Sequence, residues 1–403
     1  MKKFSHPIRV RLRSPVKVAR FTTAVIAPRP SLFLLGCALL ALILPVSAAD
    51  NQPNSSPPLF VVATLSDSVS VIDSATNEVT DQIPVGDYPV RLTVTPDGRK
   101  AYVSNDFGHT ISVIDTVNRI VTATIPTGRA GPEELTVTPD GDWVFVVFRR
   151  GGLAAVIDTS TDKVVAKVPT GGQGKDVLAT PDNRFVYVAN YTANQVSVID
   201  RATFQVNNIP TPPGPRRLAI SPGGDRIYVA DFLGKAFSVI DTASQTLLKN
   251  ITVGHKPRGM AVTPDGGEIY VANVSDNNIS VIDNNDLRIV ATIPVGAQPW
   301  HLVSTPDGAF VYVSNSQSET VSVIDTATHA VVKTLSVGAG PFFSVIDPGR
   351  TKLYVSNALD TTVSVIDLAS QSVFATVSGV GEQPFDLAFG TTGELTGPAA
   401  PTR

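Results

Sequence analysis

Short apolar segments separated by polar turns make up residues 302–338, which read LVSTPDGAFVYVSNSQSETVSVIDTATHAVVKTLSVG. In four segments, Val, Ile, Leu and Tyr predominate, and polar residues alternate with them most clearly in TVSVID. Pro, Asp, Asn and Gly mark the turns. Runs of this composition bounded by such residues are typical of β-strands. The chain beyond residue 48 shows no helical period. The stretch therefore predicts four short strands.

The same pattern recurs along nearly the whole chain. Four strands in a unit of about 40–45 residues indicate a propeller blade, because a lone four-stranded sheet buries its faces only when sheets stack around an axis. We therefore predict an all-β, eight-bladed β-propeller of four-stranded blades over residues 59–390. The Asp that closes each VID triplet marks the eight units: Asp73, Asp115, Asp158, Asp200, Asp241, Asp283, Asp325 and Asp367.

The two ends of the repeat region complement each other. With strands A to D named from the axis outward, residues 59–86 supply strands B, C and D but no strand A. Residues 385–389 supply a strand A that no strand B follows. We therefore expect the C-terminal strand to join the N-terminal blade and close the ring.

Residues that recur in the repeat are expected to build the scaffold. An aromatic residue of strand B should pack between blades, the VID Asp should start a turn, and an Asn ten residues before it should hold a loop. The aromatic residues are Phe60, Tyr102, Phe145, Tyr187, Tyr228, Tyr270, Tyr312 and Tyr354. The Asn residues are Asn105, Asn190, Asn273, Asn315 and Asn357.

The first 48 residues have a different composition. Residues 1–30 contain eight Lys and Arg and no acidic residue, and an apolar run ending in VSA follows. This order predicts a cleaved secretory signal over residues 1–48. The alternatives are an uncleaved membrane anchor and a lipoprotein attached at Cys37. Residues 49–58 are predicted to be a disordered linker and residues 391–403 a disordered tail.

Charge and cysteine content restrict the function. The chain has 32 basic and 35 acidic residues, so loss of the eight basic leader residues leaves 24 against 35. An acidic protein is a poor general binder of nucleic acid. Cys37 is the only cysteine, so a cleaved chain has no disulfide, thiolate metal ligand or thiol nucleophile.

The motifs YVSN, SVID, TPDG and IPVG together resemble the YVTN-type β-propeller repeat family, over about residues 59–390. The resemblance implies an exported propeller of the kind found among periplasmic, extracellular and cell-surface proteins. That family has no single shared reaction, so function has to be sought in particular residues. Two units depart from the pattern: Arg149 and Arg150 follow Phe148 in one, and Asp231 replaces Asn in the other, followed by Phe232 and Lys235.

Function is expected where the repeat differs at equivalent positions. The largest differences fall just before strand A, in loops that should surround the mouth of the central channel. The eight pairs are Val90 and Arg91, Glu133 and Glu134, Lys175 and Asp176, Arg216 and Arg217, Arg258 and Gly259, Trp300 and His301, Phe342 and Phe343, and Phe385 and Asp386.

The pairs form an aromatic arc and a charged arc, and the loops between strands B and C should add side chains to the same face. Aromatic and Arg residues anchor many protein interfaces, and they equally suit an acidic or aromatic small ligand. The alternative is that they are channel plugs and solvated loops. The candidate binding residues are Trp300, His301, Phe342, Phe343, Phe385, Arg216, Arg217, Arg258, Arg91, Glu133, Glu134, Lys175, Asp176, Arg149 and Arg150.

Motifs of catalysis are absent from the sequence, which contains no HExxH, GxSxG, Walker loop or CxxCH. His109, His255 and His301 are too far apart around the ring to form one zinc site, and His329 should lie on the opposite face. We predict no catalytic residue, no metal and no cofactor.

The sequence therefore favours an exported, monomeric, non-catalytic scaffold that binds a protein partner or small ligand at the channel mouth. Membrane association is expected only if the leader is uncleaved. One alternative is a cation-dependent, lactonase-like hydrolase using His301 with Glu133, Glu134 or Asp176. The other is a carrier of non-covalent haem or quinone, with His301 or His255 as axial ligand.

Overall fold

The computed structural model describes residues 56–128 and 131–390. The predicted leader (1–48), the tail (391–403) and most of the linker (49–58) lie outside these residues. In the described part, no helix has the length and apolarity needed to cross a membrane.

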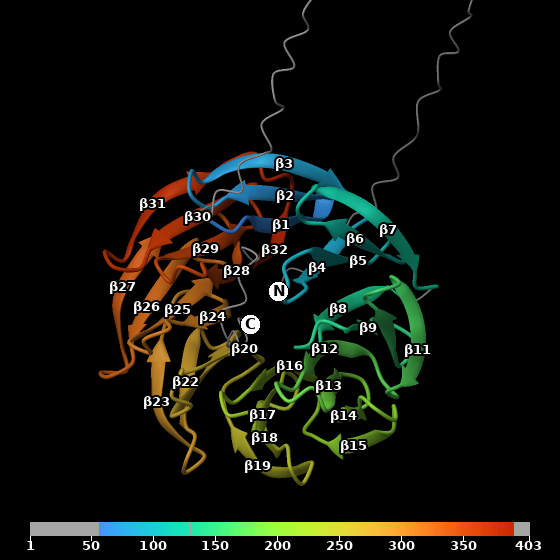
Figure 1. The fold of residues 1–403 in the computed structure, drawn as a ribbon. Helices are drawn as coiled ribbons and strands as arrows, with labels where there is room; N and C mark the ends of the chain where they lie inside the picture. The colour runs from blue at the N-terminus through green and yellow to red at the C-terminus, as the bar shows by residue number, and fades with distance from the viewer. Residues whose placement is uncertain (1–55, 129–130, 391–403) are drawn as a thin grey trace, which may run out of the picture. The chain divides into compact units, whose positions relative to one another are not determined.

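Eight antiparallel four-stranded sheets surround a central axis, which confirms the predicted eight-bladed β-propeller (Figure 1). Blade 1 contains β4–β7, and the following blades take four strands each up to β28–β31 in blade 7. Blade 8 combines β32 with β1, β2 and β3.

The strands run from the axis outward in the order A, B, C, D. The A strands are β4 (Pro89–Val94), β8 (Pro132–Val137), β12 (Gly174–Ala179), β16 (Pro215–Ile220), β20 (Pro257–Val262), β24 (Pro299–Ser304), β28 (Pro341–Ile346) and β32 (Pro384–Phe389). The B strands are β1 (Leu59–Ala63), β5 (Lys100–Asn105), β9 (Trp143–Phe148), β13 (Phe185–Asn190), β17 (Arg226–Asp231), β21 (Glu268–Asn273), β25 (Phe310–Asn315) and β29 (Lys352–Asn357).

The outer half of each blade is equally regular. The C strands are β2 (Ser68–Asp73), β6 (Thr110–Asp115), β10 (Leu153–Asp158), β14 (Gln195–Asp200), β18 (Ala236–Asp241), β22 (Asn278–Asp283), β26 (Thr320–Asp325) and β30 (Thr362–Asp367). The D strands are β3 (Glu78–Pro84), β7 (Ile120–Pro126), β11 (Lys163–Pro169), β15 (Val206–Pro210), β19 (Thr246–Thr252), β23 (Arg288–Pro294), β27 (Ala330–Ser336) and β31 (Ser372–Val377). A short 3-10 helix, η1 (Thr64–Ser66), follows β1.

The ring closes as the sequence predicts. Strand β32 pairs antiparallel with β1, with Leu59 opposite Phe389 and Phe60 opposite Ala388. The last strand of the chain thus becomes strand A of blade 8, whose other three strands come from the start of the repeat region.

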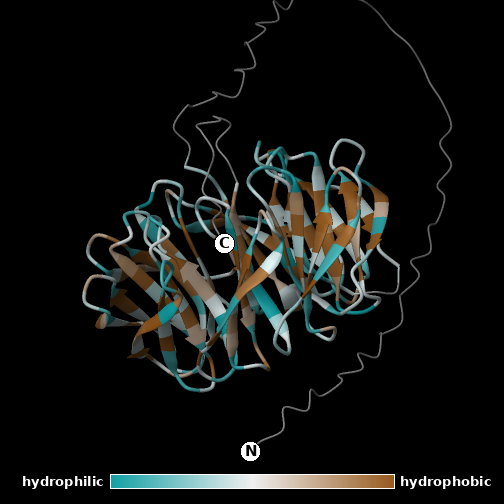
Figure 2. Cartoon of the chain, turned by 90° about the horizontal axis from the view of Figure 1, so that it is seen from below, coloured by the Kyte–Doolittle hydropathy of each residue, from teal (hydrophilic) through white to brown (hydrophobic). Residues whose placement is uncertain are grey.

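The hydrophobic core lies between adjacent blades, where apolar strand faces meet (Figure 2). In the first interface, Tyr102 of blade 1 packs in one cluster with Leu135 and Val144 of blade 2. The Tyr102 hydroxyl donates to Asp162 of blade 2 at 2.6 Å. The recurring aromatic residue therefore joins blades, as predicted.

The recurring polar residues stabilise turns and loops. Asp115 accepts hydrogen bonds from the backbone N–H groups of Val117 and Asn118 at 2.9 and 2.8 Å. Asn105 at the end of β5 donates to Ser112 Oγ at 2.9 Å. Both roles agree with the predictions. These side chains hold the ends of the strands in place and are engaged within the scaffold.

Hydrogen bonds show which loops share a face of the ring. The B–C loop of blade 1 bonds the segment that enters its A strand, from Asp106 N to Tyr88 O at 2.9 Å. The A–B and C–D turns bond each other instead, as in Thr116 N to Arg99 O at 3.1 Å. The B–C loops therefore lie on the face where the A strands begin, called here the mouth face, while His329 lies on the opposite face.

Candidate functional site at the channel mouth

The variable pairs lie inside the A strands, not in the preceding loops as predicted from the sequence. Val90 and Arg91, for example, are the second and third residues of β4. Pairing with the B strand shifts register at this point in all eight blades. Such a bulge bends a strand and redirects its side chains. The sequence pattern missed it because the bulge interrupts the alternation that defines a strand.

The second members of the pairs form ionic contacts across the channel. Glu134, only 2% exposed, lies 2.8 Å from Arg91 Nε and 3.1 Å from Arg217 Nη1. Arg217 Nε is also 3.7 Å from Asp176 Oδ2. One carboxylate therefore joins blades 1, 2 and 4, and both guanidinium groups are neutralised within the protein.

Two carboxylates of the same set also bind backbone amides of the following blade. Asp386 accepts from Leu92 N at 3.1 Å, and Asp176 accepts from Leu218 N at 2.8 Å. A buried amide needs such a partner, so these acids hold neighbouring A strands together. The sequence offers no signal for this role of Asp386.

Two further second members, His301 and Phe343, pack with Phe385 in an aromatic cluster. Phe343 is buried, and its ring centroid lies 5.0 Å from that of His301 and 5.2 Å from that of Phe385. The Arg91 guanidinium lies 4.3 Å from the Phe343 centroid. These residues are mainly buried, so part of the predicted binding set forms a channel plug.

His301 is a buried, neutral histidine. Its Nδ1 lies 3.2 Å from Ser344 Oγ. Burial, with a smaller contribution from the nearby positive charges of Arg217 and Arg91, lowers the pKa of His301 to about 3. The imidazole is therefore uncharged at neutral pH. Sequence reasoning did not identify Ser344, which is conspicuous only through this contact.

Glu133 is surrounded by basic side chains. Lys175 Nζ lies 3.0 Å from Glu133 Oε1, and Arg149 Nε lies 2.8 Å from Glu133 Oε2. Arg149 also pairs with Asp106 at 2.9 Å. Burial would raise the pKa of Glu133, but the charges of Lys175 and Arg149 outweigh it and lower the pKa.

The acidic residues at the mouth do not assemble into a cation site. In the described ranges, no group of three or more His, Cys, Asp or Glu side chains is placed to hold a metal ion. Glu133, Glu134 and Asp176, which the sequence suggested for a cation, each lie beside Arg or Lys instead. Arg150 is exposed and lines a groove of about 460 Å³ with Gly151 and Gly172.

Two of the four arginines in the A strands differ from the other two, Arg91 and Arg217. Arg258, 8% exposed, has its guanidinium carbon 3.4 Å from the Trp300 ring centroid. Arg216 is half-buried and lies 4.9 Å from the Phe232 centroid. Among residues 56–128 and 131–390, neither arginine forms an ion pair with a carboxylate. Burial and neighbouring guanidinium groups lower the pKa of Arg258.

Half-buried aromatic rings continue from Arg258 around the mouth. The Trp300 and Phe342 rings meet edge to face at 4.9 Å, and Phe342 lies 5.6 Å from Phe385. Trp300 Nε1 is buried and has no hydrogen-bond partner within the described residues. The structure thus brings together the predicted aromatic arc and places an unneutralised cation beside it.

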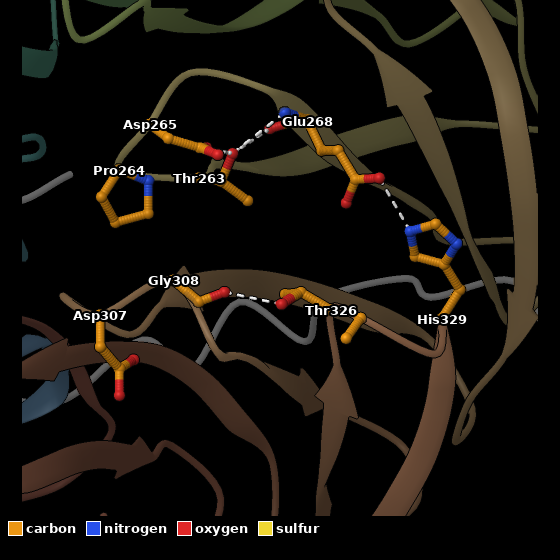
Figure 3. A pocket seen from close by; sticks show the side chains of 9 residues that line it. Thr263, Pro264, Asp265, Glu268, Asp307, Gly308, Thr326 and His329 are labelled. Atoms are coloured by element: carbon orange, nitrogen blue, oxygen red, sulfur yellow. Dashed lines mark hydrogen bonds and ion pairs between the residues drawn. The ribbon is translucent and has the colours of Figure 1, made fainter.

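A larger pocket, of about 570 Å³, lies on the opposite face between blades 5 and 6 (Figure 3). Glu268 joins the two blades, accepting from Tyr270 Oη at 2.8 Å and lying 2.8 Å from His329 Nε2. Lys100, Tyr102 and Asp162 make the equivalent contact between blades 1 and 2. The pocket is therefore a variant of a repeated inter-blade contact.

The fold and the mouth define the protein as an eight-bladed β-propeller with a non-repeating channel. A family model described as YNCE-like beta-propeller matches residues 23–160, 154–267 and 308–395. The chain belongs to this family. The match confirms the propeller expected from the motifs, but the family is related and not identical to the YVTN-type family that they resemble. A search of curated proteins finds no match.

Solved structures share the fold at low sequence identity. One is described as dihydro-heme d1 dehydrogenase NirN in complex with DHE: 16% identity, TM-score 0.72, covering 83% of this chain and 75% of that one. Kuenenia stuttgartiensis hydrazine synthase has 23% identity and TM-score 0.57, covering 70% and 96%. A functionally unknown protein from Desulfotomaculum acetoxidans DSM 771 has 20% identity and TM-score 0.58, covering 83% and 99%.

Proposed function

We propose that this protein is an exported, non-catalytic β-propeller that binds a small ligand or a protein partner at its channel mouth. The observation that carries the proposal is Arg258, a buried guanidinium without a carboxylate partner in the described residues. Burying an unpaired charge is unfavourable. A ligand or partner that supplies the missing anion would offset this cost.

The composition of the mouth supports a binding role. Trp300, Phe342 and Phe385 are only half-buried, and aromatic residues beside arginine are common anchors of interfaces. These residues occupy a position of the repeat whose residue type varies around the ring, from Val90 and Glu133 to Trp300, whereas the scaffold residues recur. The basic leader supports export to the periplasm or cell surface, and we propose that the protein acts there as a monomer.

A cofactor carrier is the second candidate, favoured by the fold shared with a protein described in complex with DHE. The two candidate histidines differ in their fit to this role. His301 is buried against Phe343, which disfavours it as an axial ligand. His255 is exposed and contacts Asp276 through Nδ1 at 2.9 Å, an arrangement that leaves Nε2 for a ligand. The unpaired arginines suit the carboxylates of a cofactor.

A cation-dependent hydrolase receives less support. The carboxylates proposed for it, Glu133, Glu134 and Asp176, are engaged with basic side chains. His301, proposed as its base, is buried and bonded to Ser344. This arrangement favours binding over acid–base chemistry.

Native mass spectrometry of the protein purified from its own host tests the proposal. We expect the native mass to exceed the chain mass by a small molecule or a second protein, and denaturation to release it. The Phe342→Ala variant should lose this added mass, whereas Phe374→Ala, which truncates a half-exposed ring on the outer strand β31, should keep it. A bare chain in every preparation would contradict the proposal.

A further inference from the structure

Carboxylates neutralise four of the cations at the mouth. Arg91 and Arg217 contact Glu134, whereas Arg149 and Lys175 contact Glu133. Every one of these cations has a carboxylate within 3.1 Å. Against this background, the unpaired Arg216 and Arg258 of the adjacent blades 4 and 5 form a local excess of positive charge.

Stacking on an aromatic ring does not by itself explain an unpaired arginine. The chain contains a second arginine over a tryptophan, Arg201 at 4.9 Å from the Trp143 centroid, on the opposite face. There, Arg201 is also paired with Asp140 at 2.5 Å and Asp142 at 3.4 Å. The Arg258–Trp300 stack lacks this neutralisation within the described residues, although Arg258 is buried.

Arg216 and Arg258 are the second residues of the neighbouring A strands β16 and β20, and their like charges repel each other in the absence of an anion. The guanidinium of Arg216 contributes to the lowered pKa of Arg258, after burial itself. A carboxylate, phosphate or sulfonate between them would reverse this effect, and guanidinium groups bind such oxyanions with charge-assisted hydrogen bonds. The pair therefore specifies an anionic group.

The neighbouring aromatic surface favours a ligand that also carries a flat ring system. From Trp300 the half-buried rings of Phe342 and Phe385 follow at centroid separations of 4.9 and 5.6 Å. Aromatic rings at these separations interact with a further flat ring by stacking or edge contacts. The position next to Arg258 allows one molecule to contact both surfaces.

We propose that the mouth binds a small planar aromatic molecule carrying a carboxylate or related oxyanion, with the anion at Arg216 and Arg258 and the ring system against Trp300 and Phe342. This inference rests on the proposed function and adds the chemical class of the ligand. The nearly complete burial of Arg258 favours a small molecule over a protein surface.

Trp300 fluorescence tests this class directly. The chain has two tryptophans, so a Trp143→Phe background leaves Trp300 as the sole reporter. The probes are 1-pyrenecarboxylate and its neutral counterpart 1-pyrenemethanol. We expect saturable quenching by the carboxylate, competition by inorganic phosphate, and binding at least about tenfold weaker for the alcohol, because hydrogen bonds to charged groups are lost.

Charge variants complete the test. In the Trp143→Phe background, Arg258→Gln should weaken 1-pyrenecarboxylate binding by at least about tenfold and leave 1-pyrenemethanol unaffected. Arg201→Gln removes the same charge on the opposite face and should change neither affinity. Equal affinities for the two probes, or unchanged carboxylate binding by Arg258→Gln, would overturn the inference.

The failure of the inference can be told from failure of the proposed function. If neither probe quenches Trp300 but the host-purified protein releases a neutral molecule or a partner protein, the ligand class is wrong and the binding role stands. If neither probe binds and the host-purified protein carries nothing, both are wrong.

Discussion

Arg258 lies over the indole of Trp300, 3.4 Å from its ring centroid, and this contact joins blades 5 and 6 at the channel mouth. The attraction between a guanidinium and an aromatic face is worth up to about 2 kcal/mol when desolvated. The cost of an unpaired buried charge is on the order of 3–5 kcal/mol. The stack alone therefore does not account for Arg258, whereas the anion that we propose would offset the remaining cost.

The mouth contains both plug residues and candidate binding residues, and alanine variants should separate them. Phe343→Ala removes a buried ring and should lower the free energy of unfolding by about 3 kcal/mol. Phe342→Ala truncates a half-buried ring and should lower it by about 1 kcal/mol. Urea unfolding followed by circular dichroism measures both. Equal losses would mean that Phe342 is also part of the plug.

Asp231 gives the protein a specific pH dependence. It stands where five other blades have Asn, and burial raises its pKa to about 8. Between its ordinary value of 3.8 and 8, the folded chain holds a proton that the unfolded chain has lost. Stability therefore falls as the pH rises through this window and levels off above it.

Asp231→Asn should remove this pH dependence of stability and keep the local contact, since Asn can donate to Ser238 as Asn105 does to Ser112. The variant should gain stability over the wild type from pH 4 to 8, because a tenfold change in a proton-binding constant on folding corresponds to about 1.4 kcal/mol. Urea midpoints across this range measure the difference. A constant difference between the two proteins at all pH values would rule out titration of Asp231.

The strand assignment has its own test in blade 6. Val323 in β26 is fully buried against Tyr312 and Val355. Val323→Asp should prevent folding of this blade, because an unpaired charge would lie in the core. Val332→Asp, on the exposed side of β27, is the matched control and should fold normally. Thermal unfolding of both variants provides the measurement, and normal unfolding of Val323→Asp would refute the strand phase.

The repeat explains why the fold was predictable. Tyr102 and Asn105 recur with fixed spacing because each blade has to make the same contacts with its neighbour. The missing strand at each end of the repeat region likewise determined the closure of β32 on β1. The periodic pattern therefore predicts how the strands are connected around the ring as well as where they lie in the chain.

The mouth was only partly predictable. Its variable residues could be identified, but the bulges that place them inside the A strands have no signature in the hydrophobic pattern. Nor could the sequence show that Glu134 neutralises Arg91 and Arg217 while Arg258 is left without a carboxylate among the described residues. Pairing across the ring depends on side chains from units far apart in the chain.

The melting temperature of Arg258→Met, measured without ligand, tests most directly whether Arg258 is kept for a bound anion. Methionine retains contact with Trp300 and removes the charge. We expect the variant to be more stable than the ligand-free wild type by about 1–3 kcal/mol, with a melting temperature several degrees higher. A lower melting temperature would show that Arg258 stabilises the ring itself and would contradict the anion site.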